Sequence, residues 1–88
     1  MKADTFFHLF DSMYEEGLID AYTLEFNPDS WACKLTAPDG RWLQFKYEYS
    51  SKDVSIFDTY NPVNGNFIPA EMLTIEYVRG YVLDWLGF

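Results

Sequence analysis

The chain has 88 residues, of which 49% are hydrophobic and 20% aromatic, and its formal net charge is −8 at pH 7. A chain of this length has room for one core, so we expect a single domain over residues 1–88, and the aromatic content argues against intrinsic disorder. The negative charge repels nucleic acid and acidic membrane surfaces and attracts basic proteins. We therefore expect neither nucleic acid nor membrane as a direct partner.

The first expected element is a helix that begins near Asp4 and ends before Gly17. Asp4 or Thr5 can cap the first turn, and Gly17 suits the left-handed position that follows a helix. Four apolar side chains recur at the spacing of one helical face and predict its buried side: Phe6, Leu9, Phe10 and Met13. The opposite side of this helix is rich in carboxylates.

Alternation of apolar and polar residues predicts four strands after this helix. Their ranges are 22–26, 31–36, 41–49 and 54–60. Pro28 in the first connection and the sequence Pro38-Asp39-Gly40 in the second favour tight turns. Because short turns pair neighbouring strands, we expect an antiparallel meander.

The C-terminal part is predicted as a helix over residues 70–86, after an irregular stretch at residues 61–66. Pro69 stands where a helix can begin. The apolar residues that share one face of this helix are Ile75, Val78, Val82 and Trp85. Residues 73–78 also alternate and include β-branched side chains, so a fifth strand is the alternative for that segment.

These elements predict an α+β fold: an antiparallel sheet of three to four strands with the N-terminal and C-terminal helices packed on one face, in the order α-β-β-β-(β)-α. The other face of the sheet would present Trp42, Gln44, Lys46 and Glu48. Base stacking on Trp42 is one use of such a face. Phosphate neutralisation supplies most nucleic-acid affinity, however, and a chain of net charge −8 is poorly suited to it.

Few side chains of this sequence suit catalysis. Nucleophilic catalysis needs a nucleophile and a base within reach, and His8 and Cys33 are the sole histidine and the sole cysteine. Cys33 alternates in phase with Trp31 and Leu35, so we expect a buried thiol that acts as a small hydrophobe. A single cysteine also excludes an intramolecular disulfide. We expect no enzyme activity.

His8 shares one helical face with Asp4 and Asp11. Two interpretations of this group are a metal site and a pH-sensitive contact. One imidazole and two carboxylates on a single helix lack the geometry of a tight tetrahedral site. We therefore favour a surface histidine and expect no metal and no cofactor.

The N-terminal sequence Met1-Lys2-Ala3-Asp4 lacks the apolar run of a signal peptide. No apolar stretch approaches the roughly 20 residues of a membrane-spanning helix. We therefore expect a soluble, cytoplasmic protein.

The acidic residues are concentrated at the two ends of the chain. Residues 1–29 hold seven acids and one base, residues 30–52 hold two acids and four bases, and residues 53–88 hold five acids and one base. Glu15 and Glu16 lie in the last turn of the predicted helix, where negative charge opposes the helix dipole. This placement indicates a role other than helix stability.

In size, acidity, aromatic richness and lack of catalytic groups, the whole chain resembles the small inhibitors that phages and mobile elements make against host defence enzymes. Anti-CRISPR proteins, anti-restriction proteins and glycosylase inhibitors are examples. The resemblance implies a non-enzymatic protein in the host cytoplasm that binds a nucleic-acid-binding enzyme stoichiometrically, as a DNA mimic does.

We predict that the partner is a protein with a basic, nucleic-acid-binding surface. The residues predicted to contact it are Asp4, Asp11, Glu15, Glu16 and Asp20, with Tyr60 and Asn64 in the long loop as a second group. The alternative function is that of an immunity protein or an adaptor-type interaction module. Such a protein would also bind a basic protein partner, so it explains the acidity equally well.

Overall fold

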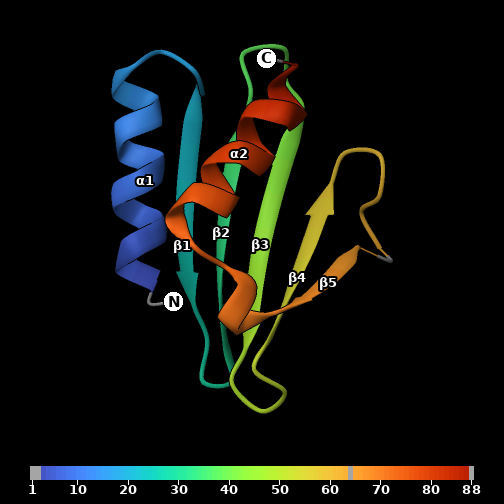
Figure 1. Ribbon diagram of the computed structural model, residues 1–88. Coiled ribbons are helices and arrows are strands. Elements are labelled where there is room, and N and C mark those ends of the chain that lie inside the picture. Colours follow the sequence, from blue (N-terminus) through green and yellow to red (C-terminus); the bar gives the residue numbers. More distant parts are fainter. Residues whose placement is uncertain (1–2, 64, 88) are drawn as a thin grey trace.

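The computed structural model describes residues 3–63 and 65–87 (Figure 1). Its elements in chain order are α1 (Ala3–Glu15), β1 (Ala21–Phe26), β2 (Ser30–Thr36), β3 (Trp42–Glu48), β4 (Asp53–Asp58), β5 (Asn66–Pro69), the 3-10 turn η1 (Ala70–Met72) and α2 (Ile75–Leu86). The α+β class and the two terminal helices are confirmed. No helix in the described part of the chain is long and apolar enough to cross a membrane.

The sheet is an antiparallel meander in the order β1-β2-β3-β4-β5. Each strand pairs with the next one along the chain, an arrangement that short connections favour. In the first turn the amide of Asn27 donates to the carbonyl oxygen of Ser30 at 2.8 Å. In the second, Gly40 adopts a φ of +92° and donates to the carbonyl oxygen of Ala37 at 2.9 Å. Both turns lie where the sequence predicted them.

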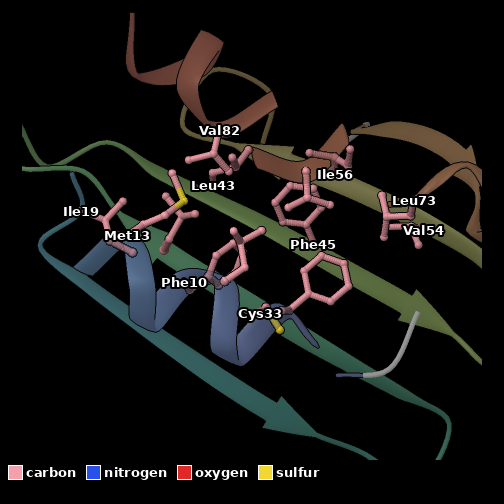
Figure 2. Close-up of a cluster of buried hydrophobic side chains, with 14 of the residues drawn as sticks. Phe10, Met13, Ile19, Cys33, Leu43, Phe45, Val54, Ile56, Leu73 and Val82 are labelled. Carbon is pink, nitrogen blue, oxygen red and sulfur yellow. The ribbon is translucent and has the colours of Figure 1, made fainter. Parts of the chain in front are cut away.

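Both helices pack on one face of this sheet and enclose the core between them and the strands (Figure 1). Figure 2 shows Phe10 of α1, Phe45 of β3 and Val82 of α2 gathered in one cluster. The ring centroid of Phe6 lies 4.9 Å from that of Trp31 and 5.5 Å from that of Phe45. The predicted apolar side of the first helix is confirmed by four buried side chains: Phe6, Leu9, Phe10 and Met13.

The end of α1 is closed by the residues that follow it. Gly17 adopts a φ of +78° and donates its amide to the carbonyl oxygen of Tyr14 at 3.0 Å. The amide of Leu18 donates to the carbonyl oxygen of Met13, also at 3.0 Å. This pair of bonds satisfies two of the last carbonyl groups of the helix, and it places Ile19 back in the core.

The structure differs from the prediction between residues 61 and 74, and the sheet has five strands where three to four were expected. Pro69 ends the edge strand β5, where its missing N–H costs nothing, and the short 3-10 turn η1 follows it in place of the expected α-helix. The helix α2 starts later, because Thr74 caps it: its Oγ1 accepts the amide of Tyr77 at 3.1 Å. A fifth strand is present, but it precedes the segment 73–78 that was proposed for it.

The face of the sheet opposite the helices carries acids and bases side by side. The ammonium group of Lys34 lies 5.0 Å from the centroid of the Trp42 ring, and the Nζ of Lys46 lies 3.4 Å from Oε1 of Glu48. Arg41 turns away from this face, because its Nη1 donates to the carbonyl oxygen of Trp85 in α2 at 2.7 Å.

Candidate partner-binding surface

The helical side of the protein carries most of its negative charge. Residues 3–20 and 70–87, which comprise the helices and the loops next to them, hold eight acids and the single base Arg79. Residues 21–69, which form the strands and their turns, hold six acids and four bases. We call the exposed acids of the first group the acidic helical layer: Asp4, Glu15, Glu16, Asp20, Glu71, Glu76 and Asp84.

Ion pairs neutralise little of this layer. Among the described residues, they join Arg41 to Asp39, Lys46 to Glu48, and Arg79 to Glu16. Only the last involves the acidic helical layer, with 3.3 Å between Nη2 of Arg79 and Oε2 of Glu16.

Of the five acids predicted to bind a partner, the structure leaves Asp4, Glu15 and Asp20 exposed and outside these ion pairs. Asp11 is half-buried, and its Oδ1 accepts the hydroxyl of Tyr22 at 2.6 Å. This hydrogen bond, with a smaller effect of desolvation, raises the pKa of Tyr22. Asp11 therefore helps to attach the helix to the sheet as well as carrying charge.

Aromatic rings complete this attachment between α1 and β1. The rings of Phe7 and Tyr14 meet that of Tyr22 edge-on, at centroid distances of 5.6 and 6.0 Å. Phe7, Asp11 and Tyr14 are spaced four and three residues apart, so they lie on one side of the helix. The spacing of the acids in the sequence does not predict this contact between α1 and Tyr22, because the contact depends on where β1 lies in the fold.

Tyr60, the described member of the second predicted group, lies far from the acids of α1. Tyr60 is 77% exposed in the loop between β4 and β5, and Asn64 lies outside the described residues. Helix α1 lies beside β1, whereas this loop lies at the opposite edge of the sheet (Figure 1). The acids of α1 and Tyr60 therefore belong to separate surfaces.

A feature that the sequence analysis missed is a hollow of about 370 Å³ on α2. We call it the Gly80 hollow, and the residues that line it are Glu76, Tyr77, Gly80, Tyr81 and Asp84. Gly80 lies two residues from each of the buried Val78 and Val82, which places it on the outer side of the helix. Glu76 and Asp84 lie one turn before and one turn after it, on the same side.

The aromatic side of the Gly80 hollow is formed by two neighbouring tyrosines, and the fold holds one of them, Tyr81. The rings of Tyr77 and Tyr81 are neighbours, with 6.3 Å between their centroids. Tyr81 is held by an edge contact with Phe45, at a centroid distance of 6.0 Å, and its hydroxyl accepts from Nδ2 of Asn66 at 3.3 Å. Contacts within the fold therefore fix the position of Tyr81 on the aromatic side of the hollow.

Gly80 itself has no packing reason to be glycine. A Cβ built on it would meet nothing within 4 Å, and its φ lies outside the left-handed region. Glycine in a helix interior costs about 1 kcal/mol relative to alanine. The signal in the sequence was a lone glycine inside a helical pattern, with an acid four residues away on each side.

The groups suited to catalysis or metal binding do not converge. Cys33 is buried, as predicted, and desolvation raises the pKa of its thiol to about 12, so the nucleophilic thiolate is rare near neutral pH. His8 is exposed on α1. Within residues 3–63 and 65–87, no three His, Cys, Asp or Glu side chains are grouped so as to hold a metal ion.

Comparison of the chain with known protein families, with characterised proteins and with solved structures gives no significant match. The acidic helical layer and the Gly80 hollow are therefore interpreted through their own charge and shape.

Proposed function

We propose that this protein is a non-enzymatic inhibitor whose acidic helical layer binds the basic surface of a nucleic-acid-binding protein. The observation that carries the proposal is the charge on the helical side, where residues 3–20 and 70–87 together hold eight acids and one base. Carboxylates bind arginine and lysine by the same charge-assisted hydrogen bonds that phosphates make. A surface of this kind competes with nucleic acid for one binding groove.

The density of charge along α1 supports mimicry of a nucleic-acid strand. From Asp4 to Glu16 the chain carries four carboxylates, and twelve residues of helix rise about 18 Å. One strand of duplex DNA carries about five phosphates over that length. Asp4 and Glu15 lie outside the ion pairs of the described residues, whereas Asp11 also accepts the hydroxyl of Tyr22 and Glu16 also meets Arg79. The helix thus offers a basic groove a sparser row of available negative groups than a DNA strand, and its charge accelerates association.

A second candidate is the immunity-protein or adaptor type of module, which would use an apolar contact. The observation that favours it is a set of exposed apolar side chains near the β4–β5 hairpin: Tyr60, Val63 and Phe67, exposed by 77%, 80% and 68%. Binding through such a surface depends on a few aromatic anchors. It would be lost on truncation of Tyr60 or Phe67 and would depend weakly on salt.

Two triple variants with the same change in net charge test the first proposal. One removes three unpaired carboxylates of the acidic helical layer through the substitutions D4N, E15Q and D20N. The control removes three exposed carboxylates from the strands and turns through the substitutions E25Q, D29N and D53N. Both should fold with unfolding free energies within about 0.5 kcal/mol of the parent, since these are surface changes.

The binding protein is first retained from a lysate of the native host on the immobilised chain and then purified. We expect duplex DNA and the chain to compete for it, and the helical-layer variant to associate about tenfold more slowly than the control at low salt. Simultaneous binding of DNA and the chain would refute mimicry. Equal association rates of the two triple variants would show that the placement of the acids is irrelevant.

A further inference from the structure

We infer that the Gly80 hollow is a binding site for an arginine side chain of the partner protein. The inference rests on the proposed function, because it names the anchor by which the acidic helical layer holds a basic surface. Three features of the hollow support it: its charge, its aromatic wall and its missing side chain.

The charge of the hollow calls for a cation from outside the chain. Glu76 and Asp84 lie one turn on either side of Gly80, about 6 Å away along the helix axis. Both are exposed, and neither takes part in the ion pairs found among the described residues. A positively charged side chain placed over Gly80 would lie between the two carboxylates.

The aromatic wall favours arginine over lysine. A planar guanidinium stacks on a tyrosine ring while its N–H groups still reach carboxylates, whereas an ammonium is a more strongly hydrated point charge. The protein already combines these contacts elsewhere: the guanidinium carbon of Arg41 lies 4.9 Å from the Trp85 ring centroid, and its Nε lies 2.7 Å from Oδ2 of Asp39. The Gly80 hollow offers two rings and two carboxylates without the cation.

Because Gly80 has no side chain, the helix backbone is accessible at the centre of the hollow. Since the fold leaves open space beyond the Cα of Gly80, alanine is compatible with the helix and would project into the hollow. Gly80→Ala therefore separates the effect of this position on helix stability from its effect on ligand binding. It favours folding, because alanine is the better helix former, and it hinders a ligand that approaches the backbone closely.

The experiment is a ¹H–¹⁵N NMR titration of the full chain with amidated nona-arginine and nona-lysine peptides at low salt. It uses the parent, Gly80→Ala, the double variant E76Q/D84N, and the control E15Q/D20N, which makes the same charge change near the end of α1. We expect nona-arginine to shift the amide resonances of Tyr77, Gly80 and Tyr81 more than nona-lysine does. Gly80→Ala should raise the Tm by about 4–8 °C and weaken nona-arginine binding about fivefold.

The outcomes separate this inference from the proposed function. If Gly80→Ala and E76Q/D84N bind nona-arginine like the parent while E15Q/D20N binds it more weakly, the acidic helical layer stands and the arginine site is refuted. If nona-arginine and nona-lysine shift the same resonances with equal affinity, arginine selectivity is refuted. If neither peptide binds the parent, both the inference and the proposed function fail.

Discussion

Replacement of Phe10 by alanine tests the packing that holds the acidic helix on the sheet. The side chain of Phe10 is 1% exposed, and its ring centroid lies 6.0 Å from those of Phe6 and Phe45. A large ring buries about 150–250 Å², which at about 25 cal/mol per Å² corresponds to about 4–6 kcal/mol of burial. Because alanine keeps part of that burial and leaves a cavity, we expect a loss of about 3–5 kcal/mol in the free energy of unfolding.

This loss is a large part of the total stability, which is about 4–13 kcal/mol for a chain of this length. Urea denaturation followed by circular dichroism measures it, and Phe10→Leu provides a milder change of about 1 kcal/mol if the alanine variant does not fold. Phe7→Ala is the matched control, since Phe7 lies on the same helix but is 40% exposed; we expect a cost of about 1–2 kcal/mol there. Equal costs at Phe7 and Phe10 would refute the assigned orientation of α1.

Two further predictions concern the cap of α2 and the buried thiol. Thr74→Ala should lower the free energy of unfolding, measured by urea denaturation, by about 1 kcal/mol, because the amide of Tyr77 loses its hydroxyl acceptor. Thr74→Ser keeps a hydroxyl acceptor and should retain most of this stability. Cys33 should resist Ellman's reagent at pH 8 in the folded protein and react in urea. Since folding raises the pKa of this thiol to about 12, the unfolded chain loses the proton first as pH rises from about 9 to 12, and stability falls there. A Cys33→Ala variant should lack that component of the alkaline loss.

The part of the fold that could be predicted is the part with local causes. The spacing of Phe6 and Phe10 sets the buried side of α1, and Gly17 marks its end because few other residues accept a positive φ. The role of Pro69 cannot be predicted from the local sequence, because its fixed φ suits both the start of a helix and the end of an edge strand. Only the pairing of β5 with β4 decides between these two uses.

The candidate site also has a part that the local sequence predicts and a part that it does not. That the first helix carries acids follows from spacing alone, but which acids are available depends on contacts distant in sequence. Glu16 meets Arg79, 63 positions later in the chain, and Asp11 meets Tyr22 across the helix–sheet contact. The Gly80 hollow depends on Tyr81 being held by Phe45 and Asn66. Such positions come from tertiary packing, which no single-sequence pattern contains.

The main rival to a binding role is that the net charge of −8 serves only solubility. Charge that only solubilises a protein has no reason to be sorted by face, and the sheet side shows such mixing, with Lys46 beside Glu48. The helical side is predominantly acidic, and two of its residues lower helix stability in a way that a solubilising surface does not require. Glu15 opposes the dipole at the end of α1, and Gly80 weakens α2. A partner that binds both the acids and the hollow accounts for the two costs together, which is why the matched-charge control and Gly80→Ala are the decisive pair of variants.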